Sequence, residues 1–316
     1  MGIDGNYSTV YPRGWFQVGY SSDLAIGAVQ PLRYFDHDLV LFRTESGTPH
    51  VFSAFCAHLG AHLGYGGTVE GDYLRCPFHA WQYDERGLCA SIPYASRIPK
   101  GASVRAWPTE ERSGIVFVWH DPECAPPAWA PPELWEFEVT GWSDYFRYQR
   151  TVRTSIAEVV ENIFDLAHGQ FVHQNDNGNS APVVTYDFDG HGATVVFENN
   201  LALLGVKTHH VTTLNDLGSN VNRATGLGAK SFLSAYTPSD EDHLDVRFSF
   251  LTPLSLPDDP DGALSRRSAE TTVTLFEQDI PIWEHKTYRS QPLLCHGDGP
   301  IGAYRKWADQ FYEKAN

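Results

Sequence analysis

The chain has 316 residues, of which 42% are hydrophobic and 13% aromatic, a composition that supports a folded core and excludes a disordered or fibrous protein. Its 23 Lys and Arg stand against 39 Asp and Glu, which gives a formal net charge of −16. Because nucleic acids and anionic membranes are bound largely through positive charge, we expect neither as a partner.

The first residues and the cysteines predict a cytoplasmic protein. Residues 1–6 have neither the basic nor the apolar stretch of a secretion signal, and no later segment reaches the roughly 18 apolar residues of a membrane span. Five cysteines do not describe a disulfide framework in so long a chain, and their odd number favours thiol or metal chemistry. Cys89, Cys124 and Cys295 have no partner at metal-binding spacing and are predicted to be free thiols.

The composition changes along the chain at a proline-rich stretch. Residues 10–120 contain short β-type runs separated by glycines, which predict a small all-β domain. Four prolines then fall within residues 124–132, a density that neither a helix nor a central strand accepts. We therefore predict an N-terminal domain, a linker and a C-terminal domain, at residues 1–124, 125–135 and 136–316.

The predicted C-terminal domain begins with a helix. Ser155 and Glu158 form a capping box ahead of an apolar stripe made by Ile156, Val160, Ile163 and Ala167. Strand-like segments follow and predict an antiparallel sheet; they cover residues 194–197, 206–214, 244–251 and 271–276. A final helix is expected to start at Pro300.

Two short motifs in the N-terminal half each supply one thiolate and one imidazole. They are Cys56-Ala57-His58 and Cys76-Pro77-Phe78-His79. Structural zinc also takes two Cys and two His, but zinc fingers usually pair like ligands in each loop. In a Rieske cluster one iron takes two cysteines and the other takes two histidines, which suits two facing loops that carry one of each. We therefore predict a [2Fe-2S] cluster, with zinc as the alternative, and interpret His62 as a loop histidine.

A second pair of histidines lies on the predicted helix. His168 and His173 are five residues apart, about 140° on an ideal helix, so both reach one metal only if the helix breaks between them. Gly169 offers a place for that break. The polar stripe formed by Glu161, Asp165 and His168 is also compatible with a plain surface helix.

A catalytic non-haem iron(II) requires two histidines and one carboxylate, so a distant acidic residue must join the pair. Asp279 has apolar neighbours and lies at the end of the last predicted strand, which makes it the expected third ligand. Glu277 and Glu284 are the alternatives, and an exposed acidic turn without any metal is the other interpretation of this segment.

Taken in order, these motifs resemble the oxygenase component of Rieske non-haem iron oxygenases, and the resemblance covers nearly the whole chain. It implies an α+β fold, in which an all-β Rieske domain precedes a helix-grip catalytic domain with a curved antiparallel sheet around a substrate cavity. It also implies that His168, His173 and Asp279 bind iron. Asn162 and Asp165, from the same motif, are implied as catalytic residues, with Asp165 joining a cluster histidine to an iron histidine.

The family also implies an assembly. Its oxygenases are head-to-tail trimers, or larger assemblies built on one, in which the cluster of one subunit supplies electrons to the iron of its neighbour. The resemblance therefore implies that His79 of one chain meets Asp165 of the next. A carboxylate that accepts imidazole N–H bonds from both sides would fix the tautomer of each ligand and couple the two centres.

The C-terminal segment resembles a narrower branch, the 3-ketosteroid 9α-hydroxylases and the sterol 7-desaturases. Residues 278–286 and the Arg305-Lys306-Trp307 motif carry this resemblance. The chain differs from the steroid hydroxylases in being shorter, chiefly at its termini, and in the sequence of residues 166–171. The resemblance implies a small apolar substrate, with steroid-like or polycyclic compounds as candidates.

The predicted function is hydroxylation of this substrate with O2. Monooxygenation consumes two electrons, and the chain has neither a plant-type ferredoxin motif nor a dinucleotide fingerprint in a βαβ context, so we expect an NAD(P)H-dependent flavin and iron–sulfur reductase or a ferredoxin as partner. Desaturation, O-demethylation and aromatic-ring dihydroxylation are the enzymatic alternatives. A Rieske electron carrier is the non-enzymatic alternative.

Overall fold

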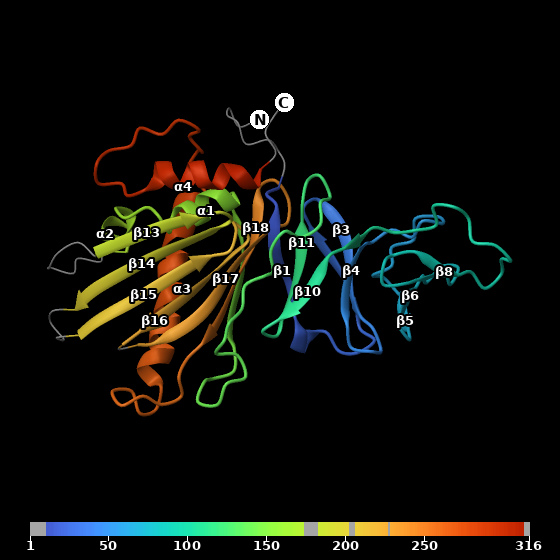
Figure 1. The fold of residues 1–316 in the computed structure, drawn as a ribbon, viewed down its shortest axis with the longest axis horizontal. Coiled ribbons are helices and arrows are strands. Elements are labelled where there is room, and N and C mark those ends of the chain that lie inside the picture. The colour runs from blue at the N-terminus through green and yellow to red at the C-terminus, as the bar shows by residue number, and fades with distance from the viewer. Residues whose placement is uncertain (1–10, 174–182, 202–205, 227, 313–316) are drawn as a thin grey trace. The chain divides into compact units, whose positions relative to one another are not determined.

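The computed structural model of the protein describes residues 11–173, 183–201, 206–226 and 228–312 (Figure 1). The chain divides into two compact units. One unit contains residues 15–131 together with 239–241, and the other contains residues 132–238 and the chain from 242 onward, with the residues before Trp15. None of the helices described is both long and apolar enough to cross a membrane.

The unit around residues 15–131 is built from short strands in three sheets, ordered β1-β11-β10, β2-β3-β4-β9 and β5-β6-β7-β8. The strands are β1 (Gly14–Tyr20), β2 (Val29–Tyr34), β3 (His37–Arg43), β4 (Pro49–Ser53), β5 (Thr68–Glu70), β6 (Tyr73–Arg75), β7 (Gln82–Tyr83), β8 (Cys89–Ser91), β9 (Ala106–Trp107), β10 (Thr109–Arg112) and β11 (Ile115–His120), with one 3-10 turn at Ser21–Asp23. All six residues of β11 are buried. This agrees with the all-β prediction.

The proline-rich segment packs against this unit. The indole N–H of Trp119 donates to the carbonyl of Ala125 over 3.0 Å, and the indole N–H of Trp15 donates to the carbonyl of Trp129 over 2.6 Å. The rings of Trp119 and Trp129 also meet edge to face at 4.8 Å. Because proline lacks an N–H group, such a segment is anchored by its carbonyls and rings rather than by a strand ladder.

The second unit is a seven-stranded antiparallel sheet with helices, ordered β12-β18-β17-β16-β15-β14-β13 (Figure 1). The strands are β12 (Phe146–Arg153), β13 (Val183–Asp189), β14 (Gly192–Leu201), β15 (Val206–Leu214), β16 (Ser219–Thr225), β17 (Lys230–Pro238) and β18 (His243–Leu251). The helices are α1 (Ile156–Glu161), α2 (His168–Phe171), α3 (Ala263–Trp283) and α4 (Ile301–Ala308), followed by a 3-10 turn at Asp309–Phe311. The predicted strands within β14, β15 and β18 and the final helix after Pro300 are confirmed.

The predicted strand at residues 271–276 is wrong, because this segment lies inside the 21-residue helix α3. Its β-branched residues favour a strand by propensity, but here the hydroxyls of Thr271, Thr272 and Thr274 each donate to the carbonyl four residues earlier. Phe276 then packs against Phe248 of the sheet, with ring centroids 4.9 Å apart. Tertiary packing of the helix face therefore outweighs the local preference.

The helix predicted from Ser155 starts as expected but is interrupted earlier than expected. The hydroxyl of Ser155 accepts the N–H of Glu158, and α1 runs only from Ile156 to Glu161. Residues 162–167 form turns, and α2 begins at His168, so Gly169 lies inside α2 and does not break the helix. The interruption still lies ahead of both histidines and changes the direction in which they point.

The C-terminal segment supports this interruption. The carbonyl of Asp298 accepts the N–H of Leu166 over 3.3 Å, and the guanidinium of Arg305 forms a two-point ion pair with the carboxylate of Glu161. The hydroxyl of Tyr304 donates to a carbonyl of α1 over 2.8 Å. Because these groups are buried or half-buried, their pairing holds the turn between α1 and α2 in one position.

We expect Gly299→Ala to destabilise the second unit. A Cβ at Gly299 would lie 2.4 Å from the carbonyl oxygen of Phe164 and 2.8 Å from Cγ of Leu166, and its φ of +89° disfavours any L side chain. The free energy of unfolding should fall by about 1–3 kcal/mol, measured by chemical denaturation. Gly297→Ala is the matched control, because a Cβ there meets nothing within 4 Å. Equal stability of the two variants would contradict the proposed support of the turn.

Candidate functional site

Two loops of the first unit, which we call the knuckles, carry the Cys-x-His and Cys-x-x-His motifs and share one backbone pattern. In each knuckle the N–H of the cysteine donates to the carbonyl of the residue five positions later. The carbonyl of the same cysteine accepts the N–H of the residue four positions later. The bonds are Cys56 N–Ala61 O (2.9 Å), Gly60 N–Cys56 O (2.9 Å), Cys76 N–Trp81 O (2.8 Å) and Ala80 N–Cys76 O (3.1 Å). Gly60 and Ala80 occupy equivalent positions and both have positive φ, 73° and 58°. The two knuckles therefore present their ligands in similar ways.

The imidazoles of the knuckles lie together and have buried nitrogens without partners. The ring centroids of His58 and His79 are 4.6 Å apart, and Trp81 stacks on His58 at 4.7 Å. The Nδ1 atoms of both histidines are buried and make no hydrogen bond. Because an unpaired buried nitrogen is costly, these two atoms fit the role of metal ligands.

The two thiols are buried beside them. The hydroxyl of Tyr83 lies 3.1 Å from Sγ of Cys56 and accepts the N–H of Ala57 over 3.1 Å. Burial raises the pKa of the Cys76 thiol, and the neighbouring Cys56 raises that pKa further, although backbone N–H groups of the knuckle lower it. A bound cation, such as the iron of a Rieske cluster, would hold the sulfur of Cys76 as a thiolate.

The geometry favours the cluster over the zinc alternative. Among the described residues, the one group of three potential ligands whose atoms lie within 4.8 Å of one another is His168, His173 and Asp279. The knuckle ligands do not form such a compact group, whereas a single tetrahedral ion would require it. His62 stays outside the knuckle ligands, because its Nδ1 accepts the N–H of Gly64 over 3.0 Å.

In the second unit the structure brings together His168, His173 and Asp279 (Figure 1 shows α2 and α3, which carry or adjoin them). The two imidazole centroids are 5.1 Å apart and nearly perpendicular, at 80°. Nε2 of His173 lies 3.6 Å from Oδ2 of Asp279. Two imidazoles and one carboxylate on one side of a common point are the ligand set of a non-haem iron(II) site.

Hydrogen bonds orient both imidazoles toward this point. Nδ1 of His168 lies 2.6 Å from the carbonyl of Asp165, and Nδ1 of His173 lies 2.9 Å from Oε1 of Gln278. Each acceptor requires the proton on Nδ1, which leaves the lone pair of Nε2 available to a metal. The amide of Asn162 donates to Oδ2 of Asp279 over 3.0 Å and lies 3.2 Å from Nε2 of His168.

Asp279 is a buried carboxylate, 6% exposed, without a Lys or Arg partner among the ion pairs of the described residues. Burial raises the pKa of Asp279, while the imidazoles of His173 and His168 and the amide of Asn162 lower it. A buried carboxylate with only imidazoles as cationic neighbours fits a metal ligand. The two alternatives lie elsewhere: Glu277 is on the outside of α3 near Tyr148, and the carbonyl of Glu284 accepts a hydrogen bond from Arg153.

Asp165 and Glu161 have local roles in this chain. Oδ1 of Asp165 accepts the N–H groups of Ala167 and His168, over 3.1 and 3.2 Å, and so stabilises the turn that leads into α2. Glu161 is paired with Arg305 and does not reach the imidazoles. Gln278 and Tyr83 are the functional contacts that the sequence reasoning missed. Gln278 directly precedes the predicted ligand Asp279, but both lie beyond the predicted strand at residues 271–276, so no predicted element gave the side chain of Gln278 a direction.

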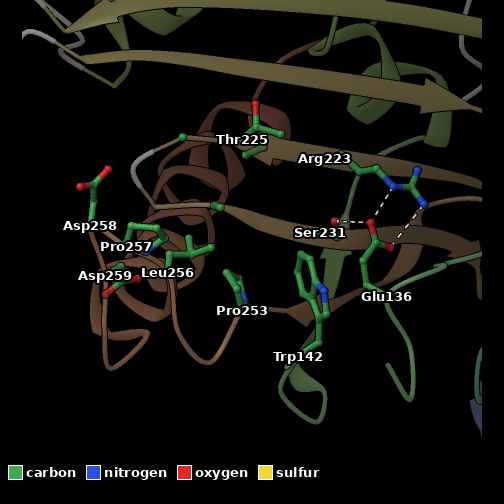
Figure 2. Close-up of a pocket in the computed structure, with 13 residues that line it drawn as sticks. Glu136, Trp142, Arg223, Thr225, Ser231, Pro253, Leu256, Pro257, Asp258 and Asp259 are labelled. Carbon is green, nitrogen blue, oxygen red and sulfur yellow. Dashed lines mark hydrogen bonds and ion pairs between the residues drawn. The ribbon is translucent and has the colours of Figure 1, made fainter. Parts of the chain in front are cut away.

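A separate pocket of about 410 Å³ lies on the outer face of the same sheet (Figure 2). Its polar groups pair with each other: Glu136 accepts Nε of Arg223 and the hydroxyl of Ser231, both over 2.8 Å. None of the iron-site residues lines it.

Cys89, Cys124 and Cys295 are free cysteines, as predicted.

Comparison with known proteins identifies the family. Residues 14–108 match the Rieske [2Fe-2S] domain, and residues 118–312 match the 3-ketosteroid 9alpha-hydroxylase C-terminal domain. The oxygenase component of a 3-ketosteroid-9-alpha-monooxygenase from Rhodococcus rhodochrous is 31% identical over 98% of this chain and 82% of its own length. A cholesterol 7-desaturase from Bombyx mori is 31% identical over 96% of this chain and 70% of its own length. The structure of dicamba monooxygenase bound to dicamba has a TM-score of 0.75 at 17% identity and covers 96% of this chain and 98% of its own.

The fold and the two sites define a Rieske non-haem iron oxygenase. The chain belongs to the family branch with the 3-ketosteroid 9α-hydroxylase C-terminal domain. It is therefore an oxidoreductase, the oxygenase component of a Rieske monooxygenase system, with a [2Fe-2S] cluster and iron(II) as cofactors. An oxygenase component requires an electron-transfer partner. The predicted resemblance, α+β fold class and cofactors are confirmed.

We expect Gln278→Leu to weaken iron binding without affecting the cluster. The change removes the acceptor of the Nδ1–H of His173, so the ring loses its fixed tautomer and orientation. Loss of such a supporting hydrogen bond should raise the dissociation constant of iron(II) by about 10–100-fold, measured by chelator competition. Gln170→Leu on the exposed side of α2 is the matched control. Unchanged iron affinity in Gln278→Leu would contradict this role.

Proposed function

We propose that this protein hydroxylates an unactivated C–H bond of a steroid-like or polycyclic substrate. Cys56, His58, Cys76 and His79 would hold the [2Fe-2S] cluster, and His168, His173 and Asp279 would hold the iron. The proposal rests above all on the convergence of these last three residues beside buried aromatic side chains. With O2 and two electrons, bound iron(II) supplies the oxidising power that such a bond requires.

The remaining contributions come from side chains of this chain. Phe276 lies on the same face of α3 as Asp279 and packs against Phe248 and Trp283, at ring distances of 4.9 and 5.3 Å. These rings would bind apolar substrate surface and exclude water from the reacting carbon. Asn162 holds the carboxylate of Asp279 in place through its amide N–H, which keeps this oxygen oriented during turnover.

Desaturation is the second candidate function. The cholesterol 7-desaturase from Bombyx mori and the oxygenase component of the 3-ketosteroid-9-alpha-monooxygenase from Rhodococcus rhodochrous are both 31% identical to this chain. Both names refer to steroid-type compounds, which supports the proposed substrate class. The position of the substrate at the iron would then decide between hydroxylation and desaturation. O-demethylation and dihydroxylation have no comparable support in these relatives.

Electron supply is proposed to follow the predicted trimer, in which His79 of one subunit meets Asp165 of the next. Large apolar side chains around the knuckles are exposed in the single chain; they are Phe55, Leu59, Tyr65 and Phe78, at 52–70%. Exposed apolar clusters of this kind are typical of surfaces that become covered. The side chain of Asp165 is 32% exposed, so it remains accessible to a neighbouring imidazole.

We propose an NAD(P)H-dependent flavin and iron–sulfur reductase, or a ferredoxin supplied by one, as the electron donor. The pairs within the seven-stranded sheet are antiparallel, which excludes a parallel dinucleotide-binding unit there. The electrons must therefore arrive from outside this unit. The cytoplasmic location stays a prediction of the sequence.

The proposed reaction is tested by product analysis with ¹⁸O2 and a panel of steroids and polycyclic hydrocarbons, with a donor reductase. Hydroxylation should incorporate one labelled atom, desaturation none and dihydroxylation two. His168→Ala is the control: it should lose iron and all product while the visible spectrum of the cluster persists. If the wild type forms only unlabelled products and His168→Ala forms none, the reaction is desaturation and not hydroxylation. Loss of the cluster spectrum in His168→Ala would contradict the division into two sites.

We expect Asp165→Asn to slow electron delivery and not substrate binding. Asparagine retains an oxygen that can accept the N–H groups of Ala167 and His168, so the fold should persist, but it lacks the negative charge proposed to bridge two imidazoles. In single-turnover stopped-flow experiments the oxidation of the reduced cluster should slow by about 10–100-fold. An unchanged rate would rule out the bridging role.

A further inference from the structure

The two histidines of the knuckles are covered by rings of different kinds. Trp81 lies flat on the imidazole of His58, with ring centroids 4.7 Å apart and planes within 8° of parallel, and this indole is only 6% exposed. The imidazole of His79 instead has Phe78 beside it, with centroids 3.8 Å apart, and Phe78 is 62% exposed. The face of His58 is therefore closed by a buried ring, whereas the ring beside His79 is itself open to solvent.

The position of Trp81 follows from the strand that it precedes. Trp81 and Tyr83 are two residues apart at the beginning of β7 and in it, and both belong to the same buried apolar cluster, so they share one face. The N–H of Cys76 donates to the carbonyl of Trp81, which ties the backbone here to the second knuckle. On this face Tyr83 contacts Sγ of Cys56, and Trp81 contacts the imidazole of His58. One strand face therefore meets both side chains of the first knuckle.

The hydroxyl of Tyr94 sets the direction of this indole. Nε1 of Trp81 donates to Oη of Tyr94 over 2.9 Å, and this N–H is the single hydrogen-bonding group of an indole. Tyr94 follows β8 in a turn closed by the N–H of Ala95 and the carbonyl of Ile92, over 3.2 Å. Ile92 is buried in the same apolar cluster as Trp81, so the turn is anchored although the ring of Tyr94 is 60% exposed.

The stack on His58 depends on this hydrogen bond for its geometry. Dispersion between two flat rings has little directional preference, so a stack alone leaves each ring free to slide and turn in its plane. A hydrogen bond requires a short distance and a nearly straight N–H···O angle, which fixes the outer edge of the indole of Trp81. The plane of the indole then defines the plane of the imidazole that it covers.

We propose that Tyr94 is a positioning residue for the [2Fe-2S] cluster. Its hydroxyl holds the indole of Trp81 against His58, and the indole fixes the plane of this imidazole and keeps water from its face. His79, whose neighbour Phe78 is exposed, stays accessible for the proposed contact with the next subunit. This inference rests on the proposed ligand assignment, because it takes His58 as a ligand of the cluster.

The cover over His58 is expected to lower the reduction potential of the cluster. Two thiolates balance the charge of the oxidised iron–sulfur core and the imidazoles are neutral, so the added electron makes the reduced centre an anion. Apolar surroundings disfavour an anion and water stabilises it, so excluding water from a ligand favours the oxidised state. A cluster with a lower potential is the stronger electron donor.

The test measures the reduction potential of the cluster in the holoenzyme by anaerobic redox titration, for the wild type, Tyr94→Phe, Trp81→Phe and the double variant. Tyr94→Phe removes only the acceptor oxygen. The potential should rise, with a change of about threefold to tenfold in the one-electron equilibrium, tenfold being about 59 mV. Trp81→Phe should also raise it. The double variant should match Trp81→Phe, because Tyr94 acts through the indole.

Nitrogen couplings of the reduced cluster provide a second readout, which the degree of cluster loading does not change. Pulsed electron paramagnetic resonance detects one coupling from each ligand imidazole, and its size depends on the orientation of the ring. In Tyr94→Phe one of the two couplings should shift. Tyr65→Phe is the matched control, because Tyr65 is 70% exposed and its ring meets His62 instead of a proposed ligand. The control should keep the potential and both couplings of the wild type.

A wild-type potential and wild-type couplings in Tyr94→Phe would overturn the positioning role but not the proposed hydroxylation. The role is also overturned if Tyr94→Phe raises the potential equally with and without Trp81→Phe. If Trp81→Phe does not load its cluster, the couplings of Tyr94→Phe decide the question. Absence of imidazole couplings from the wild type would overturn both the ligand assignment and the role of Tyr94.

Discussion

The second unit depends on one constraint: the chain must change direction between α1 and α2 so that two histidines meet a carboxylate on α3. The break before His168 sets where α2 points, and α2 then ends at Phe171, between the two histidines, whereas a continuous helix would point His168 and His173 to different sides. The ion pair between Glu161 and Arg305 and the close contact at Gly299 hold the turn from the C-terminal side. The position of the proposed metal site is therefore set in part by residues outside the proposed ligand set, and Arg305 makes α4 part of its support.

Unpaired buried nitrogens distinguish the two knuckles. The Nδ1 atoms of His58 and His79 are buried without hydrogen-bond partners among the described residues. By contrast, Glu161 and Tyr304, which support the turn between α1 and α2, are paired. Because folding rarely tolerates unpaired buried nitrogens, these two fit a group that binds from outside, the proposed cluster. The same reasoning separates these places from the outer pocket, where Glu136 and Arg223 satisfy each other.

The residues that chemistry requires could be predicted from the sequence more easily than the elements that carry them. The proposed knuckle ligands are close in sequence and share one loop pattern, and the structure brings the predicted residues His168, His173 and Asp279 together. The helix α3 was not predictable from propensity, because Thr271, Thr272 and Thr274 favour a strand until their hydroxyls bond within the helix. The contact between Gln278 and His173 was not predicted either, because it depends on the position of α3. The break before His168 depends on contacts with Asp298 and Gly299, more than 100 residues away, which no local pattern reveals.

The separation of ligands along the chain also orders the assembly of the cofactors. Both knuckles belong to the unit around residues 15–131, so their ligands leave the ribosome together, early in synthesis. The proposed iron ligands come together only after α3 has emerged, because Asp279 lies in this helix and His173 contacts the neighbouring Gln278 across 105 residues. Because N-terminal units generally fold first, cluster insertion can precede iron loading on a nascent chain. A truncated product would then retain the coloured centre and lack the oxygen-activating one.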